Sequence, residues 1–203
     1  MISATVDAAS PTPERVLELC AQVDGPAHCA RLVEAEQLKS LPNLAIRDGD
    51  QLRVSLFPSG ARDFVDVTTP DGRGRTYALW DYWSPINAAL LFTTDRERIG
   101  FALLQRATGQ VTVLPAEPFL APDRQRIAVA DFCASHCDNE LTVWRVTREG
   151  VRRELAFRPA ESWSDVTVAW KDADALSIQY TIVDEDTPRK LERKLADTGW
   201  QRL

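Results

Sequence analysis

Four cysteines in two close pairs are the residues whose type and spacing most directly suggest chemistry in this 203-residue chain. Cys20 and Cys29 lie in the segment CAQVDGPAHC, and Cys133 and Cys137 lie in the shorter segment CASHC. Closely spaced cysteines in an even number predict two local disulfides. Such disulfides are typical of an oxidising compartment, so they concern location and stability rather than activity.

The CASHC segment offers two alternatives to a disulfide. Cys133, His136 and Cys137 would present thiolates and an imidazole to a metal, but zinc takes about four ligands, and His28 is the second of only two histidines. A catalytic cysteine would need a base that converges on it in space, and a close sequence neighbour is poorly placed for that. We therefore favour the disulfide and predict neither a metal site nor a cofactor.

Hydrolytic motifs are equally sparse. A serine hydrolase needs a histidine and an acid that converge on a nucleophile, and the chain has no Gly-x-Ser-x-Gly segment. The acidic runs at Asp172 and Asp174 and at residues 184–186 fall in expected turns, where solvated carboxylates are ordinary. No catalytic residue is predicted, although a hydrolase that uses loop carboxylates such as Asp81 or Asp131 stays as an alternative.

The aromatic run Trp80-Asp81-Tyr82-Trp83 is the strongest sign of a binding surface. In a regular strand Trp80 and Tyr82 would face one way and Asp81 and Trp83 the other, so one set leaves the core unless both sheet faces are covered. Exposed tryptophan and tyrosine are enriched at protein interfaces. Together with Trp163, which we place at a loop edge, these four residues are the predicted partner-binding residues.

The overall charge limits the classes of partner. The formal net charge is −6, whereas binding to nucleic acid or to an anionic membrane surface requires basic residues. No stretch approaches the roughly 20 apolar residues of a membrane-spanning helix. The partner is therefore expected to be another protein, and neither nucleic acid nor an anionic membrane surface.

The N-terminal region predicts a flexible start and two helices. Residues 1–11 are small and polar and are expected to be disordered, as at the start of an exported chain from which a signal peptide has been removed. Residues 12–43 predict a helical hairpin that begins at Thr12 and Pro13 and is stapled by the first cysteine pair. A periplasmic or secreted location follows, with a cytoplasmic protein carrying four free thiols as the alternative.

From residue 44 onward the apolar pattern has a period of two, which predicts strands. We expect one β domain over residues 44–203, with about a dozen short strands separated by turns such as Pro58-Ser59-Gly60 and Glu149-Gly150. The fold class is therefore mainly β, an antiparallel meander with an N-terminal helical hairpin. The predicted strands are 51–57, 61–69, 75–83, 87–94, 98–105, 110–116, 126–132, 141–147, 152–157, 165–170, 176–183 and 190–195.

Some of these strands repeat a common order of strand, turn and strand at a spacing near 40 residues. The segments FLAPDRQRIAV and LTVWRV resemble the repeats of WD40-like and periplasmic β-propeller proteins, and the resemblance covers residues 87–182. It implies an irregular or small β-propeller, with a β-sandwich as the alternative. Such folds serve as binding scaffolds for many functions.

The sequence favours a non-enzymatic protein-binding domain of the bacterial envelope. The reasons are the acidic net charge, the expected disulfides, the rigid β scaffold and the lack of catalytic residues that would converge in space. A sharper version is an immunity or inhibitor protein that binds a secreted effector enzyme. The alternatives are a periplasmic hydrolase and an envelope module that binds glycan or peptide through the aromatic run.

Overall fold

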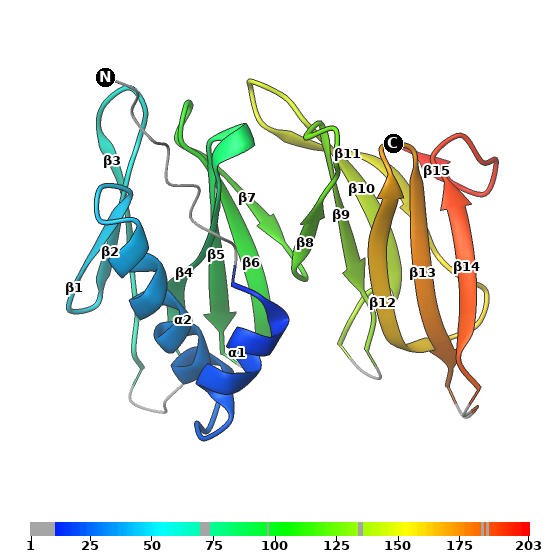
Figure 1. The fold of residues 1–203 in the computed structure, drawn as a ribbon, viewed down its shortest axis with the longest axis horizontal. Coiled ribbons are helices and arrows are strands. Elements are labelled where there is room, and N and C mark those ends of the chain that lie inside the picture. Colours follow the sequence, from blue (N-terminus) through cyan, green and yellow to red (C-terminus); the bar gives the residue numbers. More distant parts are fainter. Residues whose placement is uncertain (1–10, 70–73, 97, 134–135, 184, 186) are drawn as a thin grey trace. The chain divides into compact units, whose positions relative to one another are not determined.

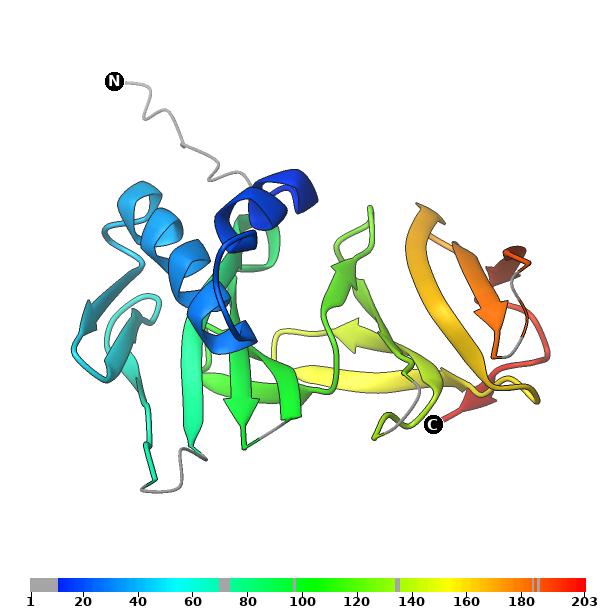
Figure 2. The same cartoon turned by 90° about the horizontal axis from the view of Figure 1, so that it is seen from below.

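A computed structural model describes residues 11–69, 74–96, 98–133, 136–183, 185 and 187–203. The expected disordered start lies outside these residues except for Pro11. The chain divides into two compact units, Met1–Val113 and Leu114–Leu203, and this boundary falls inside the β region expected over residues 44–203. Figures 1 and 2 show the elements of each unit from two directions.

Unit 1 contains both helices and two antiparallel sheets. Its sheets have the strand orders β1-β2-β3 and β4-β5-β6-β7, so each is built from consecutive strands. Its elements are α1 (Pro13–Cys20), α2 (Pro26–Ser40), β1 (Ala45–Asp48), β2 (Gln51–Ser55), β3 (Ala61–Val65), β4 (Arg75–Trp83), the 3-10 helix η1 (Ser84–Ile86), β5 (Ala88–Asp95), β6 (Arg98–Gln105) and β7 (Gln110–Leu114).

The helical hairpin forms as the sequence predicts. Thr12 caps α1 because its hydroxyl accepts a hydrogen bond from the Arg15 backbone N–H (3.2 Å), and Pro13 occupies the first turn, where no N–H partner is required. The Cys20–Cys29 disulfide joins the end of α1 to the first turn of α2. Helix α1 has no buried side chain, whereas α2 buries one face against β4.

The core of unit 1 lies where its two sheets and α2 meet. Leu52 and Val54 of β2 are fully buried against Leu79 of β4 and Leu91 of β5. Leu38 of α2 packs against the same cluster. Burying a side chain of this size contributes about 1.5–3 kcal/mol, so alternate residues of the two sheets hold unit 1 together.

Unit 2 is a pair of antiparallel sheets without a helix among its described residues. The sheets have the orders β15-β11-β10-β9-β8 and β12-β13-β14. The strands are β8 (Pro118–Leu120), β9 (Arg126–Asp131), β10 (Glu140–Val146), β11 (Val151–Phe157), β12 (Trp163–Asp172), β13 (Ala175–Ile182), β14 (Arg189–Lys194) and β15 (Gln201–Arg202).

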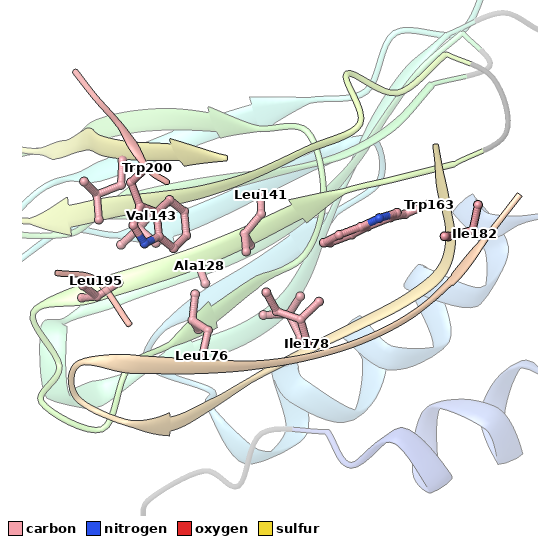
Figure 3. Packing of buried hydrophobic residues seen from close by; sticks show 11 residues of the cluster. Ala128, Leu141, Val143, Trp163, Leu176, Ile178, Ile182, Leu195 and Trp200 are labelled. Atoms are coloured by element: carbon pink, nitrogen blue, oxygen red, sulfur yellow. The ribbon is translucent and has the colours of Figure 1, made fainter. Parts of the chain in front are cut away.

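Apolar side chains from both sheets interdigitate in the core of unit 2. Figure 3 shows Leu141 and Val143 of β10 on one side of this core and Leu176 and Ile178 of β13 on the other. Trp200 closes one end of the core, and its indole N–H donates to the Lys194 carbonyl (2.8 Å). A buried tryptophan usually needs such a partner for its N–H.

The structure confirms the predicted fold class, which is mainly β and antiparallel with two helices near the N-terminus. A strand overlaps each of the twelve predicted segments. The list of twelve predicted strands omits β1, β8 and β15, which have only two to four residues each. Part of β8 nevertheless lies in the first strand of the strand-turn-strand segment FLAPDRQRIAV. Segments this short contain too few alternations to reveal a period of two.

Candidate functional site

Three hairpin loops lie at one end of unit 1 (Figure 1). Hydrogen bonds of a single residue, Arg106, connect them. The loops follow β2, β4 and β6, and we refer to Ser55–Gly60, Ser84–Asn87 and Arg106–Gly109 together as the loop platform. Two backbone hydrogen bonds connect the loops, from the Phe57 N–H to the Arg106 carbonyl (2.9 Å) and from the Arg106 N–H to the Asn87 carbonyl (3.1 Å).

The Arg106 side chain adds contacts to both neighbouring loops. Its Nε donates to the Ser55 carbonyl (2.6 Å), and its Nη1 donates to Asn87 Oδ1 (2.9 Å). The same Nη1 lies 3.1 Å from Tyr82 Oη, and the guanidinium sits 5.4 Å from the centre of the Tyr82 ring. The planar guanidinium has donors in fixed directions, so one side chain can bind both loops at once.

Two local conformations complete the loop platform. Asn87 has a left-handed backbone (φ 49°), which asparagine adopts more readily than most residues, and its Oδ1 also accepts from Tyr82 Oη (3.0 Å). Gly109 has a φ of 72°, and a Cβ at this position would lie 3.4 Å from a methyl carbon of Leu56. Together these contacts pack the Arg106 loop closely against the Phe57 loop.

Phe57 is the exposed aromatic residue of the loop platform. Its exposed fraction is 61%, and Pro58, Ser59 and Gly60 beside it are also exposed. Its backbone is nevertheless held by the hydrogen bond to Arg106. An exposed ring on a fixed backbone offers apolar area to a partner with little loss of conformational entropy on binding.

Most of the predicted aromatic run is buried in β4. Trp80, Asp81 and Trp83 are each at most 9% exposed, and only Tyr82 is half-buried and reaches the loop platform. Asp81 uses its carboxylate internally, because Oδ1 accepts from the Tyr82 N–H (2.6 Å) and Oδ2 from the Trp83 indole N–H (2.8 Å). The partner-binding role of these residues stays a prediction, and their burial does not support it.

The predicted alternation along this run is wrong because a β-bulge interrupts it. The register between β4 and β5 shifts between Leu79 and Asp81, which leaves Trp80 as the extra residue. Trp80 packs against the Phe92 ring (5.5 Å between centroids), on the face that also carries Asp81 and Trp83. Tyr82 lies on the opposite face, with the core of unit 1.

Trp163, the fifth predicted binding residue, is the first residue of β12 and is 4% exposed. Its ring stacks on Tyr180 at 3.9 Å between centroids and on Phe132 at 5.5 Å. Figure 3 shows it within the core of unit 2, close to Ile182. Trp163 is therefore a packing residue rather than the loop-edge residue expected from the sequence, and its partner-binding role stays a prediction without support from its position.

Both predicted disulfides are present, as Cys20–Cys29 and Cys133–Cys137. Their sulfurs are therefore unavailable as thiolates, which removes the basis for the catalytic and metal-binding alternatives at CASHC. Two disulfides are typical of a protein that folds in an oxidising, extracytoplasmic environment. Among the helices of the described residues, none is both long and apolar enough to cross a membrane.

The carboxyl groups with a displaced pKa do not suit general acid catalysis. The pKa values of Glu36, Asp63 and Asp95 are all lowered, in each case chiefly because an arginine side chain donates a hydrogen bond to the carboxylate. A general acid near neutral pH needs the opposite shift. Within the described part of the chain, no group of three or more histidine, cysteine, aspartate or glutamate side chains is arranged to hold a metal ion.

Sequence reasoning missed Phe57 and Arg106 as functional candidates. The signal for Phe57 was present, because an aromatic residue directly before the Pro58-Ser59-Gly60 turn must lie at a strand end. Arg106 had no local signal, since its partner Ser55 lies 51 positions away in the sequence.

No protein-family model and no curated protein sequence matches this chain. The interpretation of the loop platform therefore depends on its own geometry.

Proposed function

We propose that this protein is a non-enzymatic protein-binding domain of the bacterial envelope, periplasmic or secreted, and that the loop platform is its binding surface. The exposed Phe57 ring on a backbone held by Arg106 is the observation that carries the proposal. Loops fixed on a rigid β scaffold are common sites of recognition. An immunity or inhibitor protein of a secreted effector enzyme is the sharper form of this proposal.

The resemblance to β-propeller repeats is part of the proposal. Three of the four sheets consist only of consecutive strands, as propeller blades do, and the fourth adds β15 to an otherwise consecutive series. This arrangement supports a scaffold function, in which the loops between strands determine specificity.

Phe57→Ala tests the proposal directly. Envelope and secreted proteins of the source bacterium are passed over the immobilised protein, and the retained partner is then titrated against each variant. We expect the dissociation constant to rise at least tenfold with Phe57→Ala, which corresponds to about 1.4 kcal/mol, because the anchoring ring is lost. For an inhibitor, the enzymatic activity of the partner would also fall on binding.

Leu17→Ala is the matched control, because Leu17 of α1 is 71% exposed but lies outside the loop platform. The control variant should bind the partner as the unchanged protein does. Equal affinity of Phe57→Ala and the unchanged protein for the same partner would refute the loop platform as the binding surface.

A further inference from the structure

Strand β14 forms an open edge of the three-stranded sheet in unit 2. The sheet order β12-β13-β14 gives β14 one strand neighbour, β13. Arg189, Lys190, Glu192 and Lys194 of this strand are all exposed. An exposed edge strand presents backbone groups that can pair with another extended chain.

The register shows which backbone groups point outward. The Leu195 N–H donates to the Asp174 carbonyl (2.8 Å), which makes these two residues a hydrogen-bonded pair. Because such pairs alternate along an antiparallel ladder, Lys190, Glu192 and Lys194 direct their N–H and C=O groups away from β13.

Hydrogen bonds at Lys194 agree with this register. The outward N–H of Lys194 donates to Asp197 Oδ2 (2.9 Å), and its carbonyl accepts from the Trp200 indole (2.8 Å). At Lys190 and Glu192 no corresponding backbone bond is seen within the part of the chain that the structure describes. These two residues therefore offer two donors and two acceptors to an added strand.

The charge of the edge contrasts with that of the whole protein. Arg189–Lys194 contains four cationic residues and one acid, for a local charge of 4 − 1 = +3 in a chain of net charge −6. Glu192 pairs with Lys171 of β12 (2.6 Å), and Arg189 pairs with Glu185 (2.7 Å). Lys190 and Lys194 lie on the same face of β14 with Glu192 between them.

We propose that β14 binds an extended acidic segment of another protein by strand addition. Backbone hydrogen bonds at Lys190 and Glu192 would supply the pairing, and the two exposed lysines would meet carboxylates on the added strand. Pairing of β14 with β14 of a second copy would bring together two edges of local charge +3 each, which is less favourable than pairing with an acidic strand. This surface lies in unit 2 and does not depend on the loop platform.

Fluorescence anisotropy with a labelled peptide of alternating glutamate and valine tests this proposal. We expect saturable binding at low ionic strength that weakens as salt screens the charges. The same peptide with lysine in place of glutamate should not bind. An acidic peptide that does not bind at low salt overturns the proposal.

Two variants distinguish the effect of charge on β14 from the effect of the protein's net charge on peptide binding. Lys190→Glu should weaken binding about tenfold or more, because it places a carboxylate opposite the acidic peptide. Lys39→Glu in α2 changes the net charge equally but lies in unit 1, and it should bind as the unchanged protein does. Equal weakening by both variants would show that the peptide responds only to net charge and would overturn the site.

Backbone pairing is tested separately. Lys190→Pro removes the outward N–H of this residue without removing a hydrogen bond to β13, so it should abolish peptide binding while the unit stays folded. An acidic peptide that is N-methylated at alternate residues provides the same test on the unchanged protein. Two such peptides are needed, one methylated at the odd positions and one at the even positions, because either set of N–H groups could face β14. If both peptides bind with unchanged affinity, the strand-addition proposal is overturned.

Discussion

Units 1 and 2 each bury a glutamate against two arginines, but they differ in how much water reaches the arginines. Glu34 of α2 accepts from Arg31 (2.8 Å), from Arg47 of β1 (2.8 and 2.9 Å) and from the Leu79 backbone N–H of β4 (2.8 Å). The Arg31 and Arg47 side chains are 29% and 15% exposed, and the Glu34 side chain is 4% exposed.

Glu140 of β10 is buried to a similar degree, with 7% of its side chain exposed, and it binds Arg153 and Arg158. These arginines are 36% and 65% exposed, so water can take the place of a lost partner. The Glu34 network connects a helix to two different sheets, whereas the Glu140 network involves residues of one sheet and the segment that follows it. The Glu34 network therefore fixes how a helix and two sheets pack, whereas the Glu140 network reinforces segments that are already neighbours.

The largest expected effect is that of Glu34→Gln. The substitution keeps the shape of the side chain but leaves the shielded guanidinium groups of Arg31 and Arg47 with Asp66 as their remaining carboxylate partner. Removing one partner from a buried ion-pair network of this kind costs about 3–5 kcal/mol. Hydrogen exchange in increasing denaturant, followed separately in peptides from the two units, would show this loss in unit 1. Glu36→Gln on the same helix, at a more exposed position, is the matched control and should leave the core amides of unit 1 protected.

Glu140→Gln is the counterpart in unit 2 and should cost less, about 1–2 kcal/mol, because its arginines can be solvated. The same exchange measurement would show the change in the unit 2 peptides. If Glu140→Gln destabilises unit 2 as strongly as Glu34→Gln destabilises unit 1, the distinction based on water access is wrong.

Removal of the Cys20–Cys29 disulfide should produce an effect of intermediate size in unit 1. The double variant Cys20→Ser with Cys29→Ser removes the cross-link, and the chain-entropy model predicts that the free energy of unfolding then falls by about 2–3 kcal/mol for a loop of this length. Because α1 has no buried side chain, we expect its amides to lose protection while the sheets of unit 1 keep theirs. Exchange that rises equally in α1 and in β5 would instead show that α1 supports the core.

The smallest effect concerns pH at the contact between α1 and α2. Arg15 donates hydrogen bonds to the exposed Glu36 carboxylate and lowers its pKa from the ordinary value of 4.5. Because the pKa of Glu36 is lower in the folded state, the contact is stabilised at any pH above the ordinary pKa of the side chain. This stabilisation is lost as the pH falls through the lowered pKa of the folded state. Protection of the α1 amides should therefore decrease with acidification, with a dependence that Glu36→Gln removes and that high salt weakens.

Local features of the fold were predictable from the sequence. Thr12 and Pro13 marked the start of α1, and the period-two pattern located most of the strands. Both disulfides were also predictable, because the partners are separated by only nine and four positions. For the candidate site, the sequence supplied Tyr82 and the Pro58-Ser59-Gly60 turn but no reason to connect them.

By itself, the sequence determined the element types, the cysteine pairing and the acidic charge, because these depend on composition and on neighbours along the chain. Only the tertiary structure decided that a β-bulge at Trp80 turns three polar and aromatic side chains toward one face of β4, since a bulge depends on the pairing of two strands. The same holds for Arg106, which connects loops distant in sequence, and for Arg47, which reaches a glutamate on a helix. Such contacts form between elements, and no period along one strand can encode them.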